Sequence, residues 1–316
     1  MVSIVILPLS ATTFEHVALL PCMPDRRSPS GYSFGAIGPD GAIIPAFDHP
    51  WCEHRQPDAF VPRRLGTFIY GGLLMDHFGH FLLEAMSRLW FIRAHPELPV
   101  VWHEIRLPVP HTCWPGWWHQ LWQLLGLDHH RHHVIREPRR FRRVIVPQPG
   151  LSLNDGLHPA QATALAVLPP QPPSGERVWL SRAALPERFG RLLGEELLQQ
   201  RLAELGWKIR YPETVPVADQ VATFAQATIV AGFAGSAFHA ALLCVQPRAR
   251  LCILSRPSVA TDVYDVIAQA RGIDQKHIAV PLLRLSERVN AWTTFELASP
   301  EAAAEAVITS CAHAAC

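Results

Sequence analysis

Four titratable side chains in residues 76–90 recur at the spacing of an α-helix. His77, His80, Glu84 and Arg88 are three, four and four residues apart, so a helix would carry them along one face. The side chains between them are mostly apolar and would bury the opposite face. A histidine or carboxylate held in this way can remove a proton from an attacking hydroxyl group. The segment is therefore a candidate site for general-base catalysis.

Two other interpretations of this polar stripe stay open. His80 and Glu84 have the i, i+4 spacing of metal ligands, although the sequence lacks the His-Glu-x-x-His pattern that binds catalytic zinc. Glu84 and Arg88 could instead form an ordinary ion pair on the helix surface. The stripe therefore predicts a catalytic, a metal-binding or a purely structural role.

A second candidate site spans residues 228–243. A β-branched strand is followed by Gly232 and Gly235, and Ser236 then begins an apolar helix. Glycine permits a tight turn, and the N–H groups of the first helical turn, at the positive end of the helix dipole, favour a bound anion. We expect a phosphate or diphosphate here. The alternative is an ordinary turn in which Ser236 only caps the helix.

The elements that must position these residues fall into two groups. The proline-rich residues 168–175 can continue neither a helix nor a central strand, and they predict a boundary between domains at 1–168 and 169–316. The first domain is expected to mix strands and helices. The hydrophobic pattern predicts strands at 4–7, 67–70 and 144–146 and helices at about 78–94 and 115–125.

The second domain alternates strands and helices regularly. This order predicts a doubly wound parallel sheet, in which ligands bind beyond the carboxyl ends of the strands. The loops that carry Arg182, Glu213 and Gly235 follow such strands and should converge. Ser299 followed by Pro300 is typical of a helix start, and this last helix either stays with its own domain or packs back on the first. The predicted strands are 178–181, 207–211, 228–230 and 250–254, and the predicted helices are 187–205, 217–226 and 236–243.

The composition narrows the choice of partners. A net charge of +1 with 17% charged residues gives no field that would attract nucleic acid. Seven cysteines without a C-x-x-C pair, and an N-terminus that lacks the features of a signal peptide, favour a cytoplasmic protein. One basic run predicts either peripheral contact with a membrane surface or a solvated strand edge. It contains Arg136, Arg139, Arg140, Arg142 and Arg143.

Taken together, these segments resemble glycosyltransferase family 61. The family's first motif, Asn-x-x-His-aromatic-x-x-acid, is similar to residues 77–84, in which His77 replaces the asparagine. Ser181-Arg182 begins the second similar block, and the glycine turn with its helix forms the last. The residues between these two blocks that also match the family are Arg191, Glu195, Glu213 and Gln220. Gly194, just before Glu195, stands where the family has asparagine. In the last block, His239 occupies a position that is His or Asn in the family.

The resemblance implies an α/β fold of the GT-B type, with two Rossmann-like doubly wound domains facing a central cleft. It also implies transfer of a sugar, with inversion, from a nucleoside diphosphate donor to a saccharide or glycolipid acceptor in polysaccharide or glycoconjugate synthesis. A UDP-sugar is the expected donor, held mainly by the second domain. The catalytic set that it implies is His80, Glu84 and His77, with either His80 or Glu84 as the base, and the donor-binding set is Arg182, Arg191, Glu195, Glu213, Gly232, Gly235, Ser236 and His239.

These implied roles have a physical basis. A guanidinium group such as that of Arg182 matches phosphate oxygens bidentately and keeps its charge when it is desolvated. The glycine turn and the amides after it would stabilise the charge that grows on the leaving diphosphate. Glu213 would accept hydrogen bonds from the ribose or the base. Because positive residues can replace a metal, no cofactor is required, although Asp262 and Asp265 leave a divalent metal ion as an open alternative.

Three other functions stay open on the sequence. A non-catalytic protein that binds a nucleotide sugar or a polysaccharide would explain why His77 and Gly194 depart from the family pattern. A metal hydrolase could use His77, His80 and Glu84. A dinucleotide-dependent oxidoreductase is the least favoured, because no Gly-x-Gly-x-x-Gly follows a strand.

Overall fold

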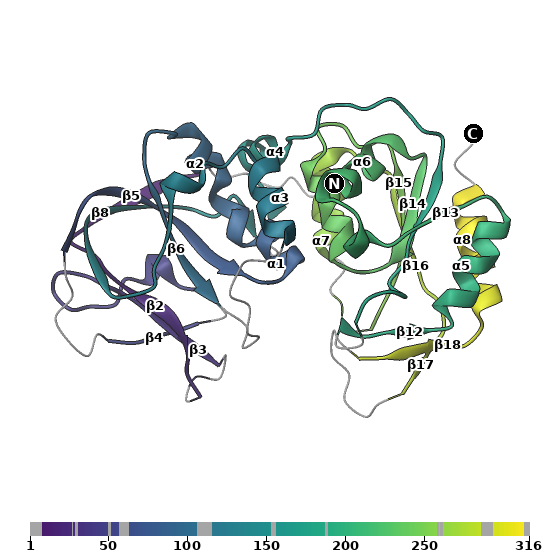
Figure 1. The fold of residues 1–316 in the computed structure, drawn as a ribbon, viewed down its shortest axis with the longest axis horizontal. Coiled ribbons are helices and arrows are strands. Elements are labelled where there is room, and N and C mark those ends of the chain that lie inside the picture. Colours follow the sequence, from purple (N-terminus) through teal and green to yellow (C-terminus); the bar gives the residue numbers. More distant parts are fainter. Residues whose placement is uncertain are drawn as a thin grey trace. The chain divides into compact units, whose positions relative to one another are not determined.

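The chain forms two compact units, residues 1–165 and 166–316, in the computed structural model (Figure 1). Each unit has its own sheets and its own buried core. The strand expected at residues 4–7 lies outside the described part of the chain. The structure describes residues 8–26, 28, 31–49, 52–56, 63–105, 116–152, 156–186, 189–257, 259, 262–285 and 293–312.

The first unit is built on a mixed eight-stranded sheet with the order β4-β3-β2-β8-β5-β6-β7, in which β1 also pairs with β8. The neighbours β8, β5, β6 and β7 are parallel, as in a Rossmann-like domain. β1 and β2 are antiparallel to β8. β3 is antiparallel to β2, because the residues that connect β2 to β3 are too few for a helical crossover. The sheet therefore departs from the doubly wound pattern that we expected for this domain. The strands are β1 (Ala11–Glu15), β2 (Ala18–Pro24), β3 (Tyr32–Ile37), β4 (Glu53–His54), β5 (Arg63–Met75), β6 (Val100–Ile105), β7 (His132–Val134) and β8 (Arg139–Pro147).

The helix expected over residues 78–94 is interrupted. α1 ends at Leu83, and the chain tightens into the 3₁₀ segment η2 before α2 begins. Arg88 in η2 is only 8% exposed, and its Nε donates to the carbonyl oxygen of Pro147 over 2.9 Å. The prediction that one helix carries Arg88 together with His77, His80 and Glu84 is therefore wrong. The remaining elements are η1 (Pro45–Phe47), α1 (Phe78–Leu83), η2 (Ala85–Arg88), α2 (Leu89–Ala94), α3 (Gly116–Leu124), η3 (His129–Arg131), β9 (Leu151–Ser152), β10 (Gly156–Leu157) and α4 (Pro159–Leu165).

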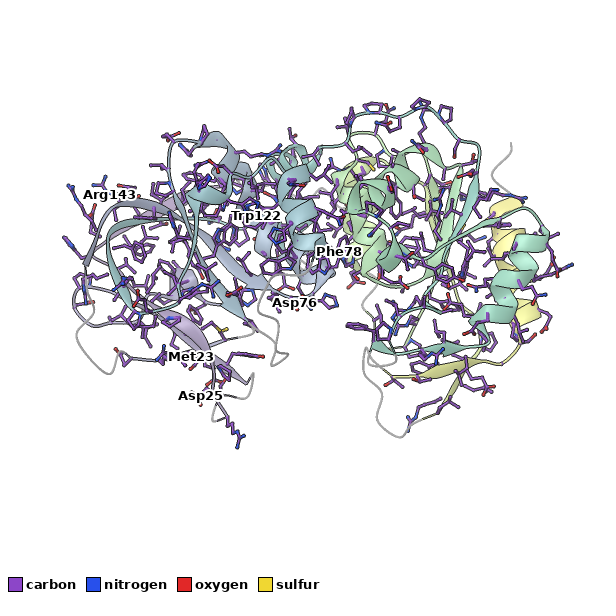
Figure 2. All side chains as sticks on the ribbon, viewed as in Figure 1. Met23, Asp25, Asp76, Phe78, Trp122 and Arg143 are labelled. Carbon is purple, nitrogen blue, oxygen red and sulfur yellow. The ribbon has the colours of Figure 1, made fainter. Side chains whose placement is uncertain are left out.

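Aromatic packing fixes α1 against α3. The ring of Phe81 is fully buried, and its centre lies 5.6 Å from that of Trp117 and 6.1 Å from that of Trp122, which is labelled in Figure 2. Burial of this side of α1 leaves the side chains of His80 and Glu84 partly accessible, at 31% and 20%. The apolar residues of the segment thus orient its polar residues.

The second unit contains the parallel five-stranded sheet that the sequence predicts, with the order β13-β11-β14-β15-β16. Helices α5 and α8 lie on one face, and α6 and α7 lie on the other (Figure 1). The chain passes from β11 to β13 and then returns to β14 on the opposite side, so the winding direction reverses between β11 and β14. A small second sheet has the order β12-β18-β17. The strands are β11 (Arg177–Leu180), β12 (Leu192–Leu193), β13 (Lys208–Arg210), β14 (Ile229–Phe233), β15 (Arg250–Leu254), β16 (Gln275–Ile278), β17 (Leu282–Arg284) and β18 (Phe295–Leu297).

The helix expected over residues 187–205 is shorter in the structure. It begins at Glu195, because Gly194 has a φ of 88°, a left-handed conformation that glycine adopts without a steric penalty. Just before that glycine, the chain forms β12, which pairs with β18. Residues 236–243 are helical as expected, but they form a 3₁₀ helix instead of an α-helix.

The last helix begins as the sequence predicts. The hydroxyl oxygen of Ser299 accepts a hydrogen bond from the N–H of Ala302 over 3.1 Å, which caps the helix. Ala304 and Val307 are fully buried in the core of the second unit. The helical elements of this unit are α5 (Glu195–Glu204), η5 (Pro212–Thr214), α6 (Val217–Gln226), η6 (Ser236–Leu243), α7 (Asp262–Arg271) and α8 (Pro300–Ala312).

The basic run of the first unit follows an exposed part of β8 and the residues before it. Arg143, labelled in Figure 2, has its Nε 2.8 Å from Oε1 of Glu15 on the neighbouring strand. Nη1 of Arg136 lies 3.7 Å from Oε2 of Glu104. The expected position at a strand edge is wrong, because β8 pairs with β1, β2 and β5 inside the sheet. Contact with a membrane surface stays a prediction. In the described part of the chain, no helix combines the length and the apolar character needed to cross a membrane.

A test of the first unit's packing uses Gly71→Ala. A Cβ atom on Gly71 would lie 2.5 Å from the indole ring of Trp102, which is fully buried in β6. We expect this variant to lose about 1–3 kcal/mol of unfolding free energy through overpacking, measured by chemical denaturation. Gly116→Ala is the matched control, because no atom of the described residues lies within 4 Å of its Cβ position, and it should stay within about 0.5 kcal/mol of wild type. Equal stability of the two variants would contradict the packing.

Candidate functional site

The second unit brings Arg182 and the glycine turn, residues 232–236, together. Arg182 follows β11 and Gly235 follows β14, and ligands bind in open α/β sheets where the winding reverses between two such strands. A Cβ atom on Gly235 would lie 2.8 Å from Nη1 of Arg182, so the guanidinium group rests directly against the turn. A Cβ atom on Gly232 would lie 2.8 Å from the carbonyl oxygen of Leu180. Both positions require glycine because the loop after β11 approaches the turn too closely to leave space for a Cβ atom.

The guanidinium group of Arg182 is held by the loop after β11. Its Nη2 donates to the carbonyl oxygen of Phe189 over 2.9 Å. Its Nε is buried and has no hydrogen-bond partner among the described residues. Burial lowers the pKa of the guanidinium group, and the nearby carboxyl group of Glu195 partly opposes that change. The result is a largely desolvated cation fixed beside the turn, which is the arrangement that binds a phosphate group strongly.

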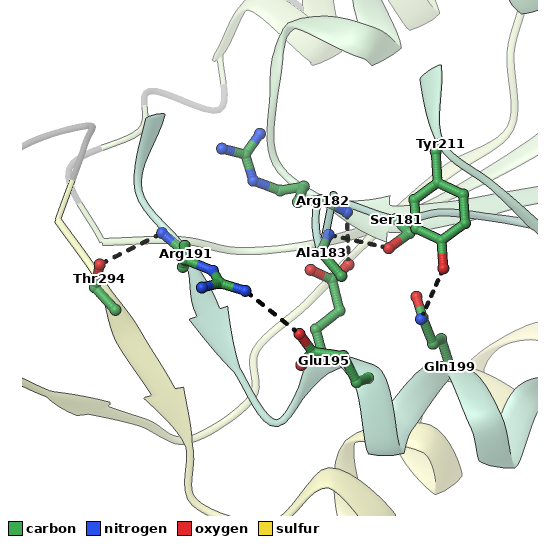
Figure 3. Close-up of polar contacts among 9 residues, drawn as sticks. Ser181, Arg182, Ala183, Arg191, Glu195, Gln199, Tyr211 and Thr294 are labelled. Atoms are coloured by element: carbon green, nitrogen blue, oxygen red, sulfur yellow. Dashed lines mark hydrogen bonds and ion pairs between the residues drawn. The ribbon is translucent and has the colours of Figure 1, made fainter. Parts of the chain in front are cut away.

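Glu195, the first residue of α5, secures the backbone that carries Arg182. Its side chain is completely buried, and its Oε1 accepts hydrogen bonds from Trp179 Nε1 over 3.2 Å and from the N–H of Arg182 over 3.0 Å. The guanidinium group of Arg182 points away from this carboxyl group (Figure 3). Burial raises the pKa of Glu195 to about 7, although its hydrogen bonds and Arg182 act in the opposite direction. Glu195 therefore fixes the backbone of the loop that carries Arg182.

The other predicted donor-binding residues lie at different distances from this centre. Glu213, in η5, is close enough for the charge of Arg182 to lower its pKa, although burial raises that pKa by more. His239 is 7% exposed in η6, and its ring centre lies 5.6 Å from that of Tyr264. Arg191 turns instead toward α5, where its Nη2 lies 3.8 Å from Oε1 of Glu196. Glu213 is thus coupled electrostatically to Arg182, whereas Arg191 pairs with Glu196 on α5.

Two residues at the same turn were missed by the sequence analysis. Arg256 follows β15, is 6% exposed, and donates from Nη1 to the carbonyl oxygen of Ala234 over 3.1 Å. The hydroxyl group of Tyr264, on α7, donates to the carbonyl oxygen of Gly235 over 3.4 Å. Burial raises the pKa of Tyr264 to about 12, so it stays protonated and can donate. A signal for Arg256 was present, because the tripeptide Leu-Ser-Arg at 180–182 recurs at 254–256.

The first unit holds a separate cluster around Glu84. His80 Nδ1 lies 2.5 Å from Oε1 of Glu84, one helical turn away. His77 is the N-cap residue of α1, and its ring nitrogen Nδ1 accepts a hydrogen bond from the N–H of His80 over 3.4 Å. The rings of His77 and His80 have centres 4.6 Å apart. The three predicted catalytic residues therefore lie together, and Glu84 orients the imidazole of His80.

His49 joins this cluster from a distant part of the sequence. Its Nε2 lies 3.5 Å from Oε2 of Glu84, on the opposite side of the carboxyl group from His80. Burial lowers the pKa of His49 to about 4, although Glu84 acts in the opposite direction, so His49 is neutral at neutral pH. No local sequence signal indicates this residue, because its role depends only on long-range packing. Glu84 is thereby flanked by two imidazole rings.

The metal alternatives concern His80 with Glu84 in the first unit and Asp262 with Asp265 in the second. Within the described residues, no three His, Cys, Asp or Glu side chains are grouped so that they could hold a metal ion. The carboxyl oxygen Oδ1 of Asp265 lies 3.1 Å from Nε2 of His277 and also accepts a hydrogen bond from Gln275. Asp262 and Asp265 both lie in the first turn of α7. Sugar transfer without a required metal ion stays a prediction.

Comparison with known proteins identifies one family. The family model described as Glycosyltransferase 61 matches residues 78–252, which is more than half of the chain. The matched segment runs from α1 into β15, so it contains both His80 and Arg182 but neither His49 nor Arg256. No curated protein matches the sequence.

The raised pKa of Glu195 predicts how stability changes with pH. Between about pH 4.5 and 7, the folded state keeps a proton that the unfolded state has lost, so this group makes stability fall as pH rises through that window. Glu195→Gln removes the titration and retains an oxygen acceptor for Trp179 and Arg182. We expect the unfolding free energy of the variant, relative to wild type, to rise across this window by up to about 3 kcal/mol.

Denaturation series at several pH values check this expectation. The control is Glu196→Gln, because Glu196 is the exposed neighbour of Glu195 on the same helix and should show no such trend. A difference between Glu195→Gln and wild type that does not vary with pH would mean that the carboxyl group is ionised in the folded state throughout.

Proposed function

The chain belongs to the glycosyltransferase 61 family, and from that membership we propose that it transfers a sugar from a nucleoside diphosphate donor to a hydroxyl group of a saccharide or glycolipid acceptor. We take the donor to be a UDP-sugar and the transfer to proceed with inversion, in the synthesis of a polysaccharide or glycoconjugate. The observation that carries the proposal is the contact between the guanidinium group of Arg182 and Gly235 where the winding of the parallel sheet reverses.

The second unit is the proposed donor-binding part. A diphosphate at the glycine turn would meet a largely desolvated guanidinium group on one side and the amides at the start of η6 on the other. As the glycosidic bond breaks, negative charge grows on the leaving diphosphate, and these fixed positive groups stabilise it. This arrangement can supply the charge that a divalent metal ion supplies in other transferases. Glu213 is the proposed partner of the ribose or the base.

The first unit is the proposed source of the base. The short contact between Glu84 and Nδ1 of His80 favours a proton on Nδ1, which makes Nε2 the proton acceptor of the ring. Glu84 would stabilise the imidazolium that forms when His80 takes a proton from the acceptor hydroxyl group. His80 is also more accessible than Glu84, with side-chain exposures of 31% and 20%. We therefore assign the base to His80 and the orienting role to Glu84. The two units would act on one donor and one acceptor, as in the GT-B arrangement expected from the resemblance.

Donor binding is tested with Arg182→Ala. Removal of a charge-assisted contact to phosphate should weaken UDP binding by about tenfold or more in isothermal titration calorimetry. Arg201→Ala is the control, since Arg201 lies on the exposed side of α5 and pairs with Glu204. Undiminished UDP affinity in Arg182→Ala would remove that residue from the donor site.

The assignment of the base is tested by the rate of transfer. His80→Ala should slow the release of nucleoside diphosphate in the presence of an oligosaccharide acceptor panel by about 10²–10⁴-fold, while donor affinity stays unchanged. Glu84→Gln should slow it less, because the imidazole remains but loses its orienting carboxylate. His95→Ala, an exposed histidine after α2, is the control. A wild-type protein that binds a donor but transfers nothing would instead support the non-catalytic alternative.

A further inference from the structure

The sequence Leu-Ser-Arg occurs at 180–182 and again at 254–256. The first copy ends β11 and the second ends β15, and these two strands flank β14 on either side in the parallel sheet. The backbone continues in the same way after both strands. The N–H of Ser181 donates to the carbonyl oxygen of Arg210 over 2.8 Å, and that of Ser255 donates to the carbonyl oxygen of Ile278 over 2.9 Å.

The two arginines that end these copies meet the glycine turn from both sides. Nη1 of Arg182 lies against Gly235, where a Cβ atom would be only 2.8 Å away. Nη1 of Arg256 donates to the carbonyl oxygen of Ala234, the residue just before that glycine. The carboxyl end of β14 is therefore bracketed by two guanidinium groups that come from its two neighbouring strands.

Arg182 and Arg256 lie close enough for the charge of Arg182 to act on Arg256. Burial, and then the positive charge of Arg182, lowers the pKa of Arg256 to about 10. The carboxyl group of Glu195 opposes the lowering of both arginine pKa values, and Glu213 opposes it for Arg182. An anion bound at the turn would be attracted by both guanidinium groups.

We infer that Arg256 is a second cation of the diphosphate site, which secures the glycine turn through Ala234 and adds positive charge on the side of the turn opposite Arg182. This inference rests on the proposed donor binding at the same turn. Arg256 and Tyr264 lie beyond the segment that the family model matches, so this part of the site comes from the chain's own C-terminal residues. A diphosphate carries charge on two phosphoryl groups, and one guanidinium group on each side of the turn suits such a ligand better than a monophosphate.

The experiment compares nucleoside diphosphates with monophosphates. UDP and UMP, with the matching guanosine and cytidine pairs in parallel, are titrated into wild type, Arg182→Gln and Arg256→Gln. We expect each variant to reduce the ratio of diphosphate to monophosphate affinity by about tenfold, because each removes a charge-assisted contact. The matched control is Arg250→Gln, since Arg250 lies at the opposite end of β15 and its Nε is 3.1 Å from Oδ2 of Asp274.

The outcomes separate this inference from the proposed function. If wild type binds none of these nucleotides, both fail. If Arg182→Gln lowers the ratio and Arg256→Gln leaves it unchanged, only the role of Arg256 is overturned. A parallel loss of diphosphate and monophosphate affinity in Arg256→Gln also overturns it, because that result shows only a structural effect on the turn.

Arg256→Lys keeps the inference testable if Arg256→Gln does not fold. The introduced ammonium group would be buried beside Arg182, with Tyr264 and Glu195 as the other titratable groups that act on this position, so its pKa should fall well below the usual value. We expect the UDP affinity of this variant, unlike that of wild type, to decline as the pH is raised above neutrality. A pH profile identical to that of wild type would overturn the role of the charge.

Discussion

The close approach of β11 and β14 at their carboxyl ends is the constraint on which the proposed donor site depends. Gly232 lets the carbonyl oxygen of Leu180 come near, and Gly235 leaves space for the guanidinium group of Arg182. A Cβ atom at position 232 would press on the backbone of Leu180, and one at position 235 would displace the guanidinium group of Arg182. The turn, the arginine and the start of η6 can therefore form one anion-binding surface only because both residues lack a Cβ atom.

Burial then determines the electrostatics of both units. In the second unit it lowers the pKa of Arg182 and Arg256 and raises that of Glu195, which acts on both arginines, to about 7. In the first unit it keeps His49 neutral beside Glu84, and the carboxylate remains available to orient His80. Under the proposed function, one unit would bind the anion and the other would supply the proton acceptor, which are the two functions that sugar transfer from a diphosphate requires.

Local patterns predicted many elements well. The helix at 217–226 and the strand at 250–254 have the predicted bounds, and Ser299 caps the last helix as its position before a proline indicated. The helix expected over 187–205 fails because the left-handed Gly194 delays its start. The helix over 78–94 is interrupted by η2, in which Arg88 is buried and donates to the carbonyl oxygen of Pro147. Both errors come from tertiary contacts that helical periodicity does not record.

The sequence by itself determined the family resemblance, the parallel sheet of the second unit, and the association of His80 with Glu84, because residues four apart on a helix are neighbours in any packing. Only the tertiary structure decided which side chains from distant segments complete each cluster. His49, which precedes β5 in the sequence, contacts Glu84. Arg256, which follows β15, donates to the carbonyl oxygen of Ala234 after β14. Such contacts depend on strand order and on which faces are buried, and a linear pattern of residues specifies neither of them.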